Sequence, residues 1–300
     1  MTAGKKNHPL LPLFLFFILA TAILAKADDG AANKSPAAFS VKITGTGRPM
    51  ILIPGLSCSG DVWDGTVAHF KDHYECHVMT LAGFAGQPAV SAPFMEQVRA
   101  GIVKYIREKK LDHPVIVGHS LGGFMAYWVA ETAPDQVGPV IAVDGLPFLS
   151  LLFNPAATVE SSRAIAEQFR ARYDSQSPEA FVSANRMALE GMITNPKNVE
   201  AVEATSRKSD PKAVGEAVYE LMITDLRPGL SKIQSPVLLI GSTQSVAASE
   251  ALYRTEVAAI PNHKVVFAPK ARHFVQLDDP QFFYSQAESF LKDAGPAGTK

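Results

Sequence analysis

The chain has 300 residues, of which 47% are hydrophobic and 19% charged, and its formal net charge is −1. This length and composition suit one large α/β domain with an inserted subdomain better than two separate domains. The near-neutral charge and the lack of a Lys/Arg stripe with interleaved aromatic residues argue against nucleic-acid binding.

The N-terminus has the pattern of a secretory signal peptide. Lys5 and Lys6 precede a mostly apolar run at residues 10–24, and the small-residue site Ala25-Lys26-Ala27 follows. The alternative is a retained membrane anchor. The run is shorter than the roughly 20 residues that span a bilayer and contains Pro12, so a cleaved signal peptide is favoured.

We therefore predict that residues 1–27 are removed before Asp28 and that residues 28–38 form a flexible leader. The mature protein is then exported, to the periplasm or out of the cell, with no stable membrane association. Export would permit a disulfide between Cys58 and Cys76. However, Cys58 follows one predicted strand and Cys76 begins the next, at opposite edges of a parallel sheet, which predicts two free, mostly buried thiols.

Strand and helix patterns alternate after the leader. The expected strands are short apolar or alternating runs at 39–44, 50–54, 74–81, 114–118, 140–144, 237–241 and 264–268. Helix patterns lie between most of them, such as 93–110, where apolar residues recur three and four positions apart. This alternation predicts an α/β fold with a mostly parallel central sheet flanked by helices, built from residues 39–145 and 226–295.

Residues 146–225 interrupt this alternation because they carry no strand pattern. Helix starts are marked instead at Ser177-Pro178, Asn195-Pro196 and Asp210-Pro211, each a capping side chain before a proline. We predict a helical insertion. Its apolar start at 148–153 is either the core of the insertion or an apolar wall facing a substrate.

The strongest local motif is VIVGHSLGGF at residues 115–124. An apolar strand runs into Gly118-His119-Ser120-Leu121-Gly122, and a helix pattern follows. This spacing is typical of a nucleophile held on a strained strand-to-helix turn, where only glycine fits on either side. The motif predicts that Ser120 is a nucleophile.

With this motif in this context, the chain resembles the α/β-hydrolase fold superfamily over essentially the whole mature chain. The resemblance implies an eight-strand type of sheet, a helical lid after the sixth strand and a triad in the order Ser, Asp/Glu, His. It also implies attack on a carbonyl with neither cofactor nor metal, so a small ester-like molecule is the expected partner.

Two further segments are similar to functional parts of that superfamily. LIPGLSCSGDVWD at 52–64 resembles the oxyanion loop, with the backbone N–H groups of Leu56 and Leu121 as the expected donors. APKARHFVQLDDP at 268–280 places His273 after the last strand, as expected of the general base. Asp278 and Asp279 in that segment are interpreted as helix caps.

The acid of the triad is less evident. In many members it follows the strand expected here at 237–241, but the sequence after that strand is STQSVAAS. Asp144, which ends the strand at 140–144, would project from the C-terminal edge of the sheet and is the preferred candidate. Asp225 is the alternative, although it could instead pair with Arg227. Glu250, or a Ser–His dyad with no acid, is also possible.

These residues predict a serine hydrolase that cleaves carboxylic esters of small to medium acyl chains, or lactones, through an acyl-enzyme intermediate. The same fold also supports amide, thioester and carbon–carbon bond hydrolysis and perhydrolase chemistry. A non-catalytic binding protein of the same fold is the alternative from another class, although a binder has no need of a strained serine.

Overall fold

The computed structural model describes residues 1–2, 37–244 and 249–295, so the predicted signal peptide and almost all of the predicted leader lie outside the described residues. The residues described from 37 onward belong to one compact unit. Within the described ranges, no helix is both long enough and apolar enough to cross a membrane.

The described residues build one seven-stranded sheet in the order β1-β3-β2-β4-β5-β6-β7. Only β1 runs antiparallel to its neighbour; β2 to β7 are parallel. The strands are β1 Phe39–Thr44, β2 Arg48–Ile53, β3 Tyr74–Leu81, β4 Val115–His119, β5 Val140–Val143, β6 Val237–Ser242 and β7 His263–Ala268. The predicted α/β fold with a mostly parallel sheet is confirmed.

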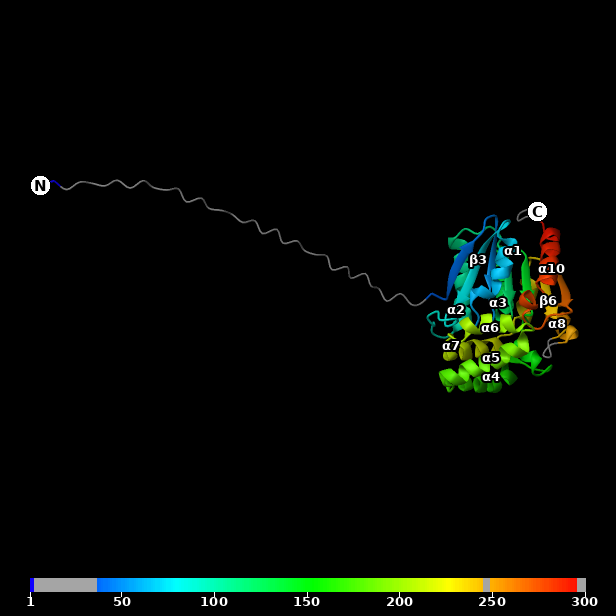
Figure 1. Cartoon of the computed structure of the whole chain (residues 1–300). Helices are drawn as coiled ribbons and strands as arrows, with labels where there is room; N and C mark the ends of the chain where they lie inside the picture. Colours follow the sequence, from blue (N-terminus) through cyan, green and yellow to red (C-terminus); the bar gives the residue numbers. More distant parts are fainter. Residues whose placement is uncertain (3–36, 245–248, 296–300) are drawn as a thin grey trace. The chain divides into compact units, whose positions relative to one another are not determined.

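Helices cover both faces of this sheet (Figure 1). They are α1 Asp64–Phe70, α2 Phe94–Glu108, α3 Leu121–Thr132, α4 Val159–Asp174, α5 Pro178–Met192, α6 Pro196–Ser206, α7 Pro211–Ile223, α8 Glu250–Glu256, α9 Val275–Asp278 and α10 Pro280–Asp293. Short 3₁₀ helices occupy Gly60–Trp63, Leu149–Leu152 and Arg227–Lys232.

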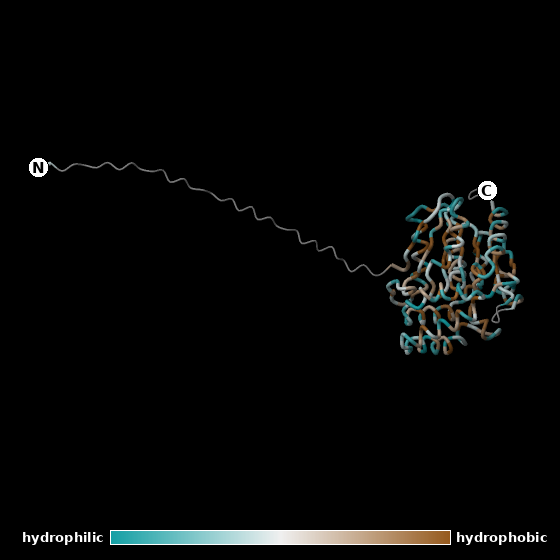
Figure 2. Tube along the Cα trace, in the orientation of Figure 1, coloured by the Kyte–Doolittle hydropathy of each residue, from teal (hydrophilic) through white to brown (hydrophobic). Residues whose placement is uncertain are grey.

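Alternate residues of each central strand face opposite sides of the sheet. In β2, Ile51 and Ile53 pack into the layer that holds α2 and α3, while Met50 and Leu52 pack into the layer that holds α1 and α10. Both sides are apolar because both are covered, which explains why the central strands are continuous hydrophobic runs. Figure 2 shows these apolar strands inside the body and hydrophilic segments around it.

The helical insertion at 146–225 contains α4 to α7, which gather at one end of the sheet (Figure 1). The three predicted caps are confirmed: Ser177, Asn195 and Asp210 each accept a hydrogen bond from a backbone N–H in the first turn, with proline following. Each such cap contributes about 1 kcal/mol. Together they fix where these helices begin.

Counted along the described chain, the insertion follows the fifth strand, β5, whereas the resemblance implied the sixth. The difference arises because seven strands are described here, against the eight of the implied sheet. What matters for the site is unchanged: the insertion leaves the sheet directly after Asp144 and Gly145.

The two cysteines are free and buried, as predicted. Cys76 lies near the start of β3, where it pairs in register with Met50, and Cys58 lies beyond the end of β2. Burial raises the pKa of the Cys58 thiol to about 12 and that of Cys76 to about 11, so both stay protonated and unreactive at neutral pH.

Candidate active site

Ser120 occupies the sharp turn between β4 and α3. Its φ of +54° and ψ of −117° lie where residues other than glycine are rarely found. The strain is held by hydrogen bonds on both sides: the Ser120 N–H donates to the Val143 carbonyl at 2.8 Å, and the Phe124 N–H donates to the Ser120 carbonyl at 3.0 Å. The side chain is only half-buried, so the serine is presented at the end of the sheet.

The two glycines that flank Ser120 are required for close packing of backbone. A Cβ atom on Gly118 would lie 2.0 Å from the Gly122 carbonyl oxygen, and a Cβ on Gly122 would lie 2.2 Å from that of Ile53. Both contacts are far inside van der Waals distance. The G-x-S-x-G spacing in this chain is therefore a steric requirement of the turn.

His273 is hydrogen-bonded to Asp144. The His273 Nδ1 lies 2.5 Å from Asp144 Oδ2, and the Asp144 side chain is 1% exposed, against 22% for His273. A carboxylate only accepts, so Nδ1 carries the proton and Nε2 is left as a base. Asp144 follows β5 with a φ of +49°, a second strained non-glycine residue at the site.

The other acids considered from the sequence lie elsewhere. Asp225 is engaged by Arg227, whose Nη2 and Nε lie 2.7 and 2.8 Å from its two oxygens. Glu250 is the exposed first residue of α8 and pairs with Arg254 at 3.8 Å. The structure thus brings Asp144, and neither alternative, to His273.

The loop that follows β2 approaches Ser120 closely. A Cβ on Gly55 would lie 2.8 Å from His119 Nδ1 and 3.3 Å from Ser120 Cβ, so glycine is needed there. Leu56 follows in this loop, and Leu121 is the first residue of α3, where backbone N–H groups have no partner within the helix. The dipole of α3 adds partial positive charge at the same place.

The side chain of His119, next to Ser120 in the chain, is hydrogen-bonded to the loop that carries His273. It is fully buried at the end of β4, and its Nε2 donates to the His273 carbonyl oxygen at 3.1 Å. Burial, with the nearby His273 adding to it, holds the pKa of His119 well below its ordinary value. The ring is therefore neutral and is a structural donor, a role that its place in the motif did not indicate.

The interpretation of both Asp278 and Asp279 as helix caps was wrong for Asp278. Asp279 does cap α10, by accepting from the Phe282 N–H. Asp278 does not cap that helix: its carboxylate accepts from the Arg272 N–H at 3.0 Å and from the Thr194 N–H at 2.9 Å. Asp278 thus joins the loop that holds His273 to the insertion. The Asp-Pro pattern beside it is typical of a helix cap and gave no indication of this long-range contact.

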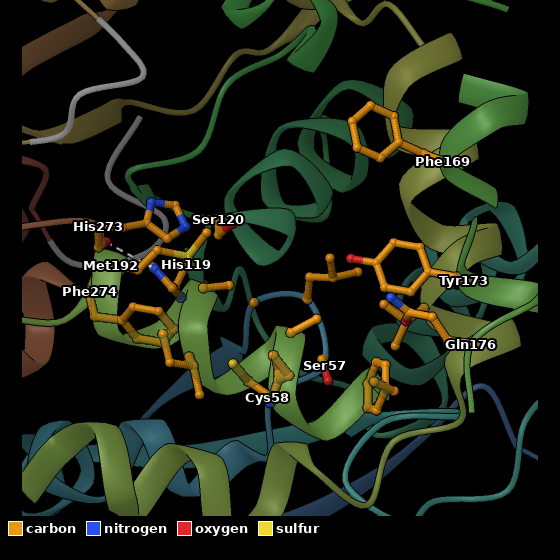
Figure 3. Close-up of a pocket in the computed structure, with 18 of the residues that line it drawn as sticks. Ser57, Cys58, His119, Ser120, Phe169, Tyr173, Gln176, Met192, His273 and Phe274 are labelled. Atoms are coloured by element: carbon orange, nitrogen blue, oxygen red, sulfur yellow. Dashed lines mark hydrogen bonds between the residues drawn. The ribbon is translucent and has the colours of Figure 1, made fainter. Parts of the chain in front are cut away.

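Ser120 and His273 line one cavity of about 300 Å³. Both lie at the same end of it in Figure 3, with Phe169, Tyr173 and Gln176 at the other end. The cavity wall is mainly apolar and comes largely from α4 and α5, through Phe169, Tyr173, Phe181, Ala184, Ala188, Leu189 and Met192. The apolar start of the insertion at 148–153 is not part of this wall; Phe148 and Leu151 belong to a small core of their own.

Within the described residues, His273 Nδ1 donates to Asp144, the His273 carbonyl oxygen accepts from His119 Nε2, and no hydrogen bond joins Ser120 to His273. The serine hydroxyl rotates about a single bond, and such contacts commonly tighten only when substrate is bound. No three His, Cys, Asp or Glu side chains in the described part of the chain gather as a metal site would require.

Two residues that sequence patterns did not single out complete the surroundings of Asp144. The Tyr253 hydroxyl on α8 donates to Asp144 Oδ1, and the Ser242 N–H at the end of β6 donates to the same oxygen at 3.1 Å. The only signal in the sequence was that both residues follow the strand expected at 237–241, after which the family resemblance leads us to expect an acid. Asp144 thereby has both oxygens occupied.

The chain is similar in sequence to known esterases and lactonases. The chain is 23% identical over 256 residues to the pimeloyl-acyl-carrier protein methyl ester esterase of Aliivibrio salmonicida, covering 83% of this chain and 94% of that protein. It is 24% identical over 255 residues to 3-oxoadipate enol-lactonase 2 of Acinetobacter baylyi, covering 82% and 89%.

Among solved structures, the enol-lactonase from Burkholderia xenovorans superimposes with a TM-score of 0.71 at 18% sequence identity, over 85% of this chain and 96% of that one. At that identity the match concerns the fold. Residues 50–286 also match the model of the Alpha/beta hydrolase family. With a strained serine, a His–Asp pair and this match over most of its length, the chain belongs to the Alpha/beta hydrolase family.

Proposed function

We propose that the protein is a serine hydrolase that cleaves carboxylic esters through an acyl-enzyme intermediate, with Ser120, His273 and Asp144 as its triad. One observation carries the proposal: His273 is hydrogen-bonded through Nδ1 to the buried Asp144, while its ring and Ser120 line the same cavity. The related esterase and enol-lactonase support ester or lactone chemistry.

The proposed reaction begins with attack of Ser120 Oγ on the ester carbonyl carbon, as the hydroxyl proton moves to His273 Nε2. Asp144 keeps the imidazole in the tautomer whose Nε2 is free, and it stabilises the cation that forms. The oxyanion accepts hydrogen bonds from the Leu56 and Leu121 N–H groups, near the N-terminus of α3.

The tetrahedral intermediate then collapses. The C–O bond to the alcohol breaks, and the leaving alkoxide takes the proton from His273 Nε2, leaving an acyl ester on Ser120. Water enters, His273 removes one of its protons, and hydroxide adds to the acyl carbon. Release of the acid returns the proton to Ser120, so the cycle consumes one water and needs no cofactor.

The cavity favours a compact acyl group. A volume of about 300 Å³ with mainly apolar walls suits small to medium acyl chains or a lactone. In this proposal the helical insertion is a lid, since α4 and α5 supply most of the apolar wall of the cavity. Amide, thioester and carbon–carbon bond hydrolysis and perhydrolase chemistry are the alternative reactions of the same site.

A test is hydrolysis of p-nitrophenyl esters from acetate to dodecanoate by the mature chain and by Ser120→Ala. We expect activity that disappears in the variant, with an optimum at short or medium chain length. Ser91→Ala is the matched control, because Ser91 is exposed and lies outside the cavity. A fluorophosphonate probe that labels neither the native chain nor Ser91→Ala would favour the non-catalytic binding protein.

We also propose that the protein is exported and that residues 1–27 are cleaved as a signal peptide, on the charge and hydropathy pattern of the N-terminus. N-terminal sequencing of the protein from the periplasm or medium should begin at Asp28. A protein found only in the membrane fraction, with its N-terminus intact, would indicate an anchor instead.

A further inference from the structure

The carboxylate of Asp144 is held from two directions. One oxygen, Oδ2, lies against His273, and the other, Oδ1, accepts from the Ser242 N–H and the Tyr253 hydroxyl. Counted as whole residues, Asp144 is 6% exposed and Tyr253 2%, so these hydrogen bonds are shielded from water. Tyr253 comes from α8, the helix that follows β6 along the chain.

The direction of the Tyr253 hydrogen bond is fixed by chemistry. A carboxylate has only acceptors, so the phenol must donate. Burial raises the pKa of Tyr253, and the nearby Asp144 charge raises it further, so the phenol keeps its proton at neutral pH. Its ring packs edge-on against Phe267 of β7, with the centroids 5.8 Å apart, which holds the hydroxyl in place.

We propose that Tyr253 is a positioning residue that acts on His273 through Asp144, by fixing the carboxylate rotamer and sharing its negative charge. Tyr253 does not line the cavity, so it is not expected to touch substrate. The predicted effect of Tyr253 on turnover rests on the proposed function. The predicted effect of Tyr253 on the His273–Asp144 pair does not depend on that function.

Other titratable groups lie near Tyr253, Asp144 and His273, and their titration must be distinguished from that of His273. The His119 ring lies 4.7 Å from that of His273, centroid to centroid. Tyr127 of α3 interacts electrostatically with Tyr253 and also with Glu256 of α8. Burial raises the pKa of Glu256 to about 7, so it titrates in the same range as a histidine.

Removal of the phenol should change catalysis in a defined way. In Tyr253→Phe the Asp144 charge loses a donor and attracts the His273 proton more strongly, so the acidic limb of kcat/KM moves up by about half a pH unit. The carboxylate also gains rotational freedom, and we expect kcat to fall about 10-fold with KM unchanged, because the lost interaction serves the transition state.

The first experiment measures kcat and KM from about pH 5 to about pH 9 for the native chain, Tyr253→Phe and Tyr105→Phe. Tyr105 is a matched control: its hydroxyl is 2.8 Å from His77 Nδ1, so it loses a similar bond away from the cavity. Glu256→Gln, alone and combined with Tyr253→Phe, removes the Glu256 titration. A pH profile that moves equally in both Tyr→Phe variants would overturn the proposal.

A double-mutant cycle tests whether Tyr253 acts through Asp144. If it does, Tyr253→Phe costs about 10-fold in the native background and almost nothing in Asp144→Asn, since the group it positions is already lost. Equal losses in both backgrounds would show that Tyr253 serves general stability. Site-specific 3-fluorotyrosine at position 253 keeps the ring and strengthens the donor, so it should move the acidic limb down even if phenylalanine proves unstable.

Proton NMR tests the same relationship without any substrate. The His273 Nδ1 proton, shared with Asp144, should give a far-downfield resonance at low pH that is absent in Asp144→Asn. It should move further downfield in Tyr253→Phe, because a carboxylate without the phenol donor attracts the Nδ1 proton more strongly, and it should stay in place in Tyr105→Phe. An unmoved resonance in Tyr253→Phe would overturn the inference. A shifted resonance in a chain that hydrolyses no ester would sustain it while the proposed function failed.

Discussion

Asp144 and Ser242 are 98 residues apart in the chain, yet the Ser242 N–H donates a 3.1 Å hydrogen bond to the Asp144 carboxylate. They meet because β5 and β6 are parallel neighbours whose C-terminal ends lie at the same edge of the sheet. The residue that follows β5 thus carries the carboxylate, and the last residue of β6 supplies a backbone donor to it.

Gly118, two residues before Ser120, should not tolerate a side chain. In Gly118→Ala the new Cβ meets the Gly122 carbonyl at 2.0 Å, so we expect a loss of about 1–3 kcal/mol in the free energy of unfolding, with displacement of Ser120. Gly191→Ala is the control, since nothing lies within 4 Å of its Cβ in helix α5. It should gain about 0.5–1 kcal/mol. Urea unfolding measures the free energy of unfolding of both variants. Equal changes in that free energy would contradict the steric explanation for Gly118.

The length of acyl chain accepted should depend on α5. Ala184 is half-buried in the cavity wall, so Ala184→Trp should remove space needed by long chains and spare short ones. With about 0.8 kcal/mol for each buried CH₂, we expect the octanoate-to-acetate ratio of kcat/KM to fall about 10-fold or more. Ala201→Trp, on the exposed face of α6, should leave that ratio unchanged. A ratio that falls in neither variant would place the acyl chain elsewhere.

Stability should decrease as the pH rises through neutrality. Burial raises the pKa of Glu256 from 4.5 to about 7, so the folded protein holds this proton more tightly than the unfolded chain does. The resulting stabilisation is complete below about pH 4.5 and is lost as the pH passes about 7. Buried Glu220, whose pKa is also raised to about 7, adds a second contribution of the same sign.

Glu256→Gln should therefore narrow the difference in Tm between acidic and mildly alkaline buffer. Glutamine can still accept from the Phe148 N–H, which lies 2.8 Å from Glu256 Oε2. Glu250→Gln, an exposed change on the same helix, should leave the difference as it is. If both variants keep the native difference, Glu256 does not titrate as expected.

Much of the fold could be predicted because the relevant signals are local. Apolar runs of four to eight residues marked the strands of the sheet, and the Ser-Pro, Asn-Pro and Asp-Pro pairs marked α5, α6 and α7. Boundaries moved by one or two residues: β6 extends to Ser242 and α2 ends at Glu108. Such shifts depend on tertiary hydrogen bonds that periodicity does not contain.

The site residues also fall into those that a local sequence pattern predicts and those that only the fold identifies. Ser120 lies in a strong local motif and His273 in a recognisable loop, but choosing between Asp144 and Asp225 required the fold. Asp225 is paired with Arg227 two residues away, whereas Asp144 meets its partners across the sheet. Tyr253 could not be found from the sequence, because a tyrosine on a short helix has no pattern that indicates a buried donor.

The most direct test of this account compares ester hydrolysis by Asp144→Asn and Asp225→Asn. Asparagine at 144 keeps the shape but offers His273 no carboxylate, so we expect kcat to fall about 10³- to 10⁴-fold, as in other triads. Asp225→Asn breaks only the ion pair with Arg227, and should stay within about threefold of the native rate. The reverse order, or a small loss in both variants, would contradict the Ser120–His273–Asp144 triad.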